Sequence, residues 1–295
     1  MDWLALMSLL LLKPTVSGPE LQLRIEAPPA LTALRTRLES ADRKRFTDIA
    51  QLVGITDAGR PIHVVLAAED SDLAHSVRPW VAGFAVGSAD SIVIFPARSP
   101  KYPNDTLEDV LRHEVAHILI YRASGGRAVP RWFNEGLAMA AERDRRFQDQ
   151  TQLLYQLVSG PRSTLVEVDR LFSGGEDDQT RAYALAGALV RYLMQRFGVA
   201  TCAEVLATVR RGSEFDAALA SVAGATTIEV ESDFWRRQRI WTAWIPLLSS
   251  STILWSAVTL LAILAIYRRR QRNRAIENRW NEEDKHLDPD GSLDP

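Results

Sequence analysis

About the first hundred residues carry short apolar and alternating runs that predict strands, with a helical pattern after the first of them. Leu21–Ile25 alternates with the period of two that a half-buried strand shows. Apolar residues between Leu31 and Val53 recur at roughly helical spacing and stop before Gly54. Three further strands are predicted, the last two joined as a hairpin: Ile62–Ala67, Val81–Val86 and Ser91–Phe95.

The pattern becomes helical in the second part of the chain. Asp105 precedes Glu108 by three residues, the spacing of a capping box, and predicts the start of a helix. The segment Ser124–Gly126 ends this helix, and Pro130 suits the first turn of the next one, which runs to about Asp144. Four more helices are predicted, separated by polar or glycine-bearing segments: Gln152–Val158, Ala182–Phe197, Ala203–Val209 and Phe215–Val222.

Apolar segments at the two ends of the chain predict how it meets a membrane. Ile240–Tyr267 holds no charged residue and no histidine. It exceeds the roughly 20 residues that cross a hydrocarbon core, so we expect one membrane-spanning helix. Trp3–Leu12 has the length of a signal-peptide apolar region, although no basic residue precedes it. A short buried helix or a misplaced start codon is the alternative for this segment.

These segments divide the chain into four predicted parts. Residues 1–17 form a signal peptide, and residues 18–239 form an extracytoplasmic domain, periplasmic or extracellular. Residues 240–267 span the membrane once, and residues 268–295 form a tail that is expected to be disordered. The tail is assigned to the cytoplasm by the arginines that follow the span at once: Arg268, Arg269, Arg270, Arg272 and Arg274.

Composition fits an ordinary globular protein and narrows the chemistry. The chain has 295 residues, of which 46% are hydrophobic and 24% are charged. A formal net charge of −2 gives no basic field for nucleic acid, so we expect no nucleic-acid partner. Cys202 is the one cysteine, which excludes a disulfide within the chain and a zinc cage of thiolates.

The most specific chemical signal is His113-Glu114-Val115-Ala116-His117. On a helix, histidines four residues apart lie on one face, where both imidazoles can bind one metal ion. Such a motif can arise by chance on a solvated helix, but these histidines have apolar neighbours, and the chain has only five histidines. A further helix supplies Glu135, followed by the small Gly136, which allows close helix approach.

A catalytic zinc ion takes three protein ligands, and two histidines with one carboxylate form an established set. His113, His117 and Glu135 supply that set, so Zn²⁺ is the expected cofactor. Glu114 follows the first ligand directly and is expected to act as the base that activates zinc-bound water.

The two motifs together, His113–His117 and Pro130–Ala138, resemble the gluzincin metallopeptidases and are especially similar to peptidase MA-like domains. The similarity extends to Tyr183–Gly198 and Phe215–Leu219. It implies an α+β fold with a thermolysin-like catalytic core, in which a mixed sheet with a peptide-binding edge strand is followed by a helical part. It also implies zinc-dependent hydrolysis of peptide bonds.

Departures from related patterns narrow the resemblance. Gly83–Val86 offers no carboxylate where gluzincin aminopeptidases hold a free amine, which argues against aminopeptidase activity. Thermolysin-like enzymes place an aspartate that orients a histidine at the position of Met139. No residue of this chain is therefore assigned to orient a histidine. Ile120 and Ala123 replace the glycine and histidine of the metzincin pattern and exclude that class.

Tyr183 is the candidate donor to the oxyanion that develops during hydrolysis, because it begins the helix similar to the family segment. A tyrosine packed in the core is the alternative, and Tyr121, Tyr155 and Tyr192 compete for the role. The sequence thus predicts a membrane-anchored zinc metalloprotease of the endopeptidase type, acting on a peptide or protein. The alternative function is an inactive zinc-containing domain that binds a partner protein or peptide.

Overall fold

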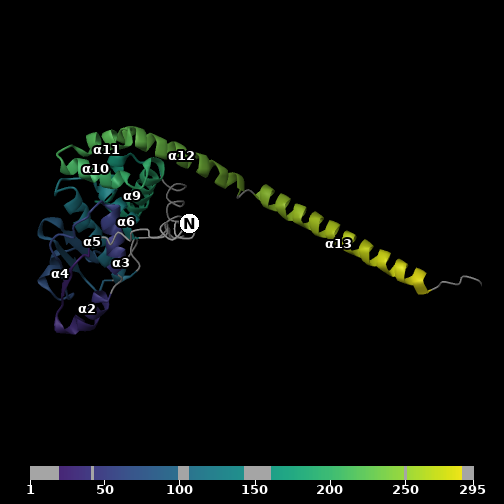
Figure 1. The fold of residues 1–295 in the computed structure, drawn as a ribbon, viewed down its shortest axis with the longest axis horizontal. Helices are drawn as coiled ribbons and strands as arrows, with labels where there is room; N and C mark the ends of the chain where they lie inside the picture. Colours follow the sequence, from purple (N-terminus) through teal and green to yellow (C-terminus); the bar gives the residue numbers. More distant parts are fainter. Residues whose placement is uncertain (1–19, 41–42, 99–105, 143–160, 249–250, 288–295) are drawn as a thin grey trace, which may run out of the picture. The chain divides into compact units, whose positions relative to one another are not determined.

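The computed structural model describes residues 20–40, 43–98, 106–142, 161–248 and 251–287 (Figure 1). The predicted signal peptide and the predicted helix Gln152–Val158 lie outside these residues. The chain divides into two compact units, Met1–Arg236 and Arg237–Pro295. Each unit is described separately below.

The first unit contains one four-stranded sheet in the order β1-β2-β4-β3. Its strands are β1 (Leu23–Glu26), β2 (Ile62–Leu66), β3 (Gly83–Val86) and β4 (Ser91–Ile94), close to the predicted positions. The pairs β1–β2 and β2–β4 are parallel, whereas β3 pairs antiparallel with β4. Between β3 and β4, the short helix η3 (Gly87–Ala89) and Asp90 in the left-handed region close the hairpin.

The two faces of the sheet pack against different elements. Alternate residues of β2 and β4, such as Val64 and Ile92, belong to the main core together with α3 (Arg43–Leu52) and α5 (Leu107–Ala123). Val93 and Phe95 point to a smaller cluster that includes Ala74 of α4 (Asp72–Ser76). The segments η2 (Pro29–Leu31) and α2 (Thr32–Glu39) follow β1. The helix α5 also packs against β3, which lies at one edge of the sheet.

The helices after the sheet complete the main core. They are α6 (Arg131–Glu142), α8 (Leu165–Leu171), α9 (Glu176–Phe197), α10 (Thr201–Arg210) and α11 (Phe215–Ala223). Cys202 is fully buried on α10, where burial raises the pKa of its thiol to about 12 and favours the neutral form. The side chain therefore acts as a small packing residue.

The start of α5 differs from the sequence prediction by one residue. The capping box is formed by Thr106 and Asp109, not by Asp105 and Glu108. The Thr106 hydroxyl accepts a hydrogen bond from the Asp109 backbone N–H, and the Asp109 carboxylate accepts one from the Thr106 backbone N–H. The predicted helix end is correct, since α5 stops at Ala123 and Gly125 and Gly126 both have positive φ.

The predicted fold class, an α+β thermolysin-like core with one membrane-spanning helix, is wrong. Helices form most of the described chain, and the sheet is small, with strands of four or five residues. The strand-forming runs in the sequence are short, and the residues after β4 add only helices among the described elements.

The second correction concerns the C-terminal apolar segment. No helix in the described part of the chain is long and apolar enough to cross a membrane. Ile240–Tyr267 is divided between α12 (Thr227–Leu248), which starts with charged residues, and α13 (Ser251–Leu287), which ends with them. The helix α12 ends two residues after Pro246, a residue type that interrupts helical hydrogen bonding. The predicted membrane-spanning helix and the single-pass localisation that rested on it are therefore wrong.

The tail of residues 268–295 was expected to be disordered, whereas α13 continues to Leu287. Residues 288–295 lie outside the described residues.

Candidate metal centre

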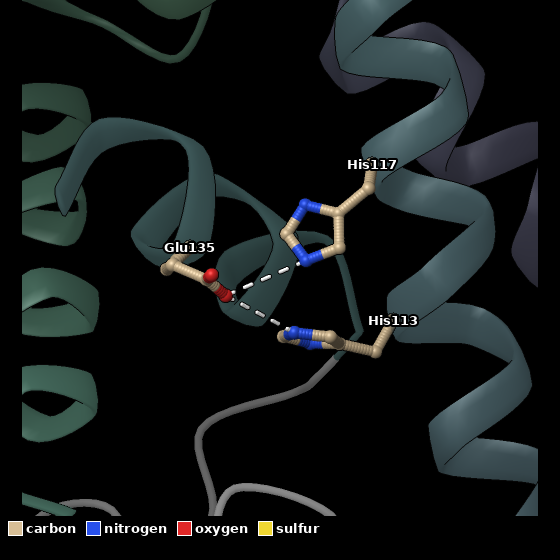
Figure 2. Close-up of side chains that lie close together, drawn as sticks. All are labelled: His113, His117 and Glu135. Atoms are coloured by element: carbon tan, nitrogen blue, oxygen red, sulfur yellow. Dashed lines mark hydrogen bonds and ion pairs between the residues drawn. The ribbon is translucent and has the colours of Figure 1, made fainter. Parts of the chain in front are cut away.

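Two histidines on α5 face a carboxylate on α6 (Figure 2). His113 and His117 are one helical turn apart, and their rings lie 4.7 Å apart between centroids, at 90° to each other. Because α5 packs between the sheet and α6, His113 and Glu114 are buried, and His117 keeps a partly exposed face. The two imidazoles are therefore held in place by the packing of α5.

Glu135 is brought to the histidines by a close contact between α6 and α9. A Cβ atom added at Gly136 would lie 2.3 Å from the carbonyl oxygen of Ala186, so only glycine permits this approach. The small residues after Glu135 were expected to allow such packing, and the structure agrees. The glutamate carboxylate, with its side chain 11% exposed, points out of this contact toward α5.

The three side chains have the spacing of a metal site. The Oε2 atom of Glu135 lies 3.3 Å from Nε2 of His113 and 3.4 Å from Nε2 of His117. One ligand atom from each residue lies within 4.8 Å of the other two. In a tetrahedron with zinc–ligand bonds of about 2.0–2.1 Å, neighbouring ligand atoms are about 3.3–3.4 Å apart. The donor set and its spacing thus fit a zinc ion.

The electrostatics of the site favour a cation between these residues. Burial alone would raise the pKa of Glu135, but the charges and hydrogen bonds of His117 and His113 outweigh it and hold that pKa well below its usual range. Burial alone would lower the pKa of His117, but the Glu135 carboxylate outweighs it and raises that pKa. Glu135 is therefore anionic, and a proton or a metal ion can balance its charge.

Sequence analysis assigned no residue to orient the histidines, and the structure shows one at Asn134. The Oδ1 atom of Asn134 lies 3.0 Å from Nδ1 of His117. An Nδ1–H donating to this oxygen leaves Nε2 with its lone pair toward Glu135, which is the state of a metal ligand. Met139, at the position of the missing aspartate, is buried instead beside Gly187 of α9. In the sequence, the signal that could have pointed to this role is the amide residue directly before Glu135.

A cavity of about 960 Å³ opens at these ligands. Glu114 lines it together with Gly83 and Ala85 of the edge strand β3. A Cβ atom added at Gly83 would lie 3.3 Å from Cγ of Glu114 and 2.8 Å from Cγ1 of Val110. The absence of a side chain at Gly83 therefore lets β3 pass close beside Glu114.

A family model described as the peptidase MA superfamily matches residues 44–241. The chain belongs to the peptidase MA superfamily. The matched residues contain α5 and α6, and therefore all three ligand candidates and Glu114 of this peptidase MA domain. A search of curated proteins finds no match to the chain.

The tyrosines of the peptidase MA domain occupy different surroundings. Tyr183 lines the cavity, with its ring 6.3 Å from that of His113 and 5.1 Å from that of Phe172, measured between centroids. Tyr121 also lines the cavity, but its ring packs over Gly87 and Gly126. Tyr192 is buried against Phe234, and Tyr155 lies outside the described residues.

Proposed function

We propose that the chain is a zinc metallopeptidase of the gluzincin type, which cleaves peptide bonds within a peptide or protein. The observation that carries the proposal is the set of ligand atoms of His113, His117 and Glu135 at distances that suit tetrahedral zinc. A carboxylate ligand on the helix after the two histidines is the gluzincin arrangement. Membership of the peptidase MA superfamily agrees with this reading.

Zinc, when bound, would supply a Lewis acid that polarises water and the peptide carbonyl. Glu114 is the general base of the proposed reaction. It takes a proton from the attacking water and later delivers that proton to the leaving amine. Support for this role comes from its place next to His113 and its presence in the wall of the same cavity.

The substrate of the proposed reaction is an extended peptide lying along β3. This strand is at the edge of the four-stranded sheet, and its residues line the cavity beside Glu114. An edge strand offers backbone N–H and C=O groups that pair with an extended chain whatever its side chains. Tyr183, which also lines the cavity, donates a hydrogen bond to the oxyanion as the carbonyl is attacked.

The proposal is tested on the full chain with three variants, a metal assay and a mixed peptide library. Glu114→Gln is expected to keep one zinc ion per chain and to lose cleavage, because the amide cannot accept the proton. His117→Ala is expected to lose both zinc and cleavage. His75→Ala is the matched control, since His75 is exposed on α4 and does not line the cavity, and it is expected to retain both.

The outcomes separate the peptidase from the other candidate. Cleavage that a chelator abolishes and that added zinc restores would support the proposal. One bound zinc ion without chelator-sensitive cleavage would favour a zinc-containing domain that binds a partner without cutting it. Full cleavage by the Glu114→Gln variant would remove the assigned base.

A further inference from the structure

Arg131, the first residue of α6, contacts Oε1 of Glu135, the carboxylate oxygen other than the one paired with the histidines. Its Nε atom lies 3.6 Å from Oε1 of Glu135, whereas Oε2 is the atom near His113 and His117. The two oxygens of one carboxylate thus have separate partners. In metal sites, carboxylate ligands commonly have their second oxygen held in this way by an outer residue.

Local helix preferences do not explain an arginine at this position. The first turn of a helix favours acidic residues, because its free N–H groups carry partial positive charge. The pair Arg131 and Glu135 also has the less favourable order for residues four apart on a helix, with the cation first. Arg131 departs from both helix preferences at the proposed metal site, which suggests that it has a function there.

The helix α8 fixes Arg131 from the other side. The Arg131 guanidinium carbon lies 4.8 Å from the centre of the Phe172 ring, directly after α8. The Asp169 carboxylate accepts hydrogen bonds from the backbone N–H groups of Arg131, at 3.3 Å, and Trp132, at 2.6 Å. Asp169 thus supplies, from another helix, the negative charge that the start of α6 lacks. With its side chain 49% exposed, Arg131 still reaches the cavity wall.

We propose that Arg131 is a positioning residue for the metal site. It holds Oε1 of Glu135, so that Oε2 alone is presented between the two histidines. Phe172 fixes the position of the guanidinium, and Asp169 fixes the start of α6. This inference rests on the proposed zinc site and assigns to it an outer residue that acts through a ligand.

The test compares Zn²⁺ binding by the full chain with that of Arg131→Gln and Arg131→Lys. Competition with a chromophoric chelator gives the zinc affinity, and thermal unfolding of the metal-free protein gives its midpoint. Arg131→Gln is expected to weaken zinc binding about 10–100-fold, the usual effect of losing an outer partner. Its metal-free midpoint is expected to stay equal or to rise, because a cation leaves the helix start.

Two comparisons separate the effect of charge from that of packing. Arg131→Lys is expected to recover part of the affinity, since it keeps a cation near Oε1. Arg127→Gln is the matched control, because Arg127 is an exposed arginine just before α6 that does not line the cavity. It is expected to bind zinc as the unchanged chain does.

Three results would overturn the inference. An Arg131→Gln variant that binds zinc as tightly as the unchanged chain would show that Arg131 does not position the site. A loss of affinity that comes with a lower metal-free midpoint would assign Arg131 a structural role only. An Arg131→Lys variant no better than Arg131→Gln would show that the cation is not the cause. If the unchanged chain binds no zinc, the proposed function fails first, and this inference fails with it.

Discussion

At the scale of single residues, two of the three candidate metal ligands each contact two partners. His117 meets Glu135 through Nε2 and Asn134 through Nδ1, and Glu135 meets the histidines through Oε2 and Arg131 through Oε1. Such paired contacts fix ring and carboxylate orientation before a metal arrives, which lowers the cost of forming the site.

Tyr183 carries the first prediction. Tyr183→Phe removes the proposed oxyanion donor and should lower kcat about 10²–10³-fold, with KM and zinc content nearly unchanged. The physical reason is that a hydrogen bond formed only in the transition state affects turnover without affecting substrate binding. Steady-state kinetics on one cleaved peptide from the library, with a metal assay on each preparation, measures this.

Tyr121→Phe is the matched comparison, because Tyr121 lines the same cavity and packs over glycines. It should change kcat by much less than Tyr183→Phe does. If the two variants exchange these effects, the oxyanion role belongs to Tyr121.

The second prediction concerns the ion pair between Arg37 of α2 and Glu108 of α5. The guanidinium makes two hydrogen bonds to the carboxylate, of 2.5 and 3.1 Å. Burial alone would raise the pKa of Glu108, but the hydrogen bonds and charge of Arg37 lower it from an ordinary value of 4.5. A carboxyl group with a lowered folded-state pKa stabilises the fold above its unfolded-state pKa and loses this effect as pH falls through the folded value.

A double-mutant cycle with Arg37→Met and Glu108→Gln measures this contribution by urea unfolding. Because Arg37 is largely exposed, the coupling free energy should be about 0.5–1 kcal/mol at about pH 7. It should decline below about pH 4.5 and approach zero at lower pH. A coupling that stays constant throughout acid titration would contradict the assignment.

Sequence spacing predicted that His113, His117 and Glu135 lie together, but it did not predict the residues around them. Two histidines four residues apart share a helix face in any helix, so His113 and His117 needed only local information. Asn134 and Arg131 act through contacts between α5, α6 and α8, and such contacts depend on how the helices pack. No periodicity in the sequence reports that packing.

At the scale of elements, the contact between α6 and α9 sets the position of Glu135. Gly136→Ala would force a Cβ atom to within 2.3 Å of the Ala186 backbone oxygen, and backbone cannot move as a flexible side chain can. The variant should lower the free energy of unfolding by about 1–3 kcal/mol, measured by urea denaturation, and should also weaken zinc binding.

Gly175→Ala is the control for this third prediction. Gly175 precedes α9, has a φ of −73°, and has open space where a Cβ atom would be added. Alanine is a poorer residue than glycine before a helix, but it also lowers the conformational entropy of the unfolded chain. These effects oppose each other, so the free energy of unfolding should change by about 0.5 kcal/mol or less. Equal losses in both variants would mean that close packing of α6 on α9 is not the cause.

Elements were predictable where the local pattern decides them. The four strands were found from apolar runs, and the end of α5 from Gly125 and Gly126. The apolar stretch Ile240–Tyr267 was misjudged because hydropathy gives length and not continuity. Pro246, two residues before the end of α12, was the sequence signal against one continuous apolar helix.

At the scale of the whole molecule, the candidate metal ligands and the main core belong to the same compact unit. The last residues of the described core are Val230 and Phe234, near the start of α12, and this unit ends at Arg236. The family match ends nearby, at residue 241. Folding of this unit should therefore determine zinc binding, and zinc should in turn stabilise this unit.

The fourth prediction follows from that linkage. A ligand that binds only the folded state adds a stabilisation of RT ln(1 + [L]/Kd), about 2.7 kcal/mol at a free concentration of 100 Kd. Removing zinc from the full chain should lower the free energy of unfolding by about this amount, measured by urea denaturation with and without a chelator. A chain ending at Trp241 should show the same difference, because the ligands and the core precede that residue. His117→Ala is the control and should show no difference. A truncated chain that no longer responds to zinc would mean that residues after 241 complete the site.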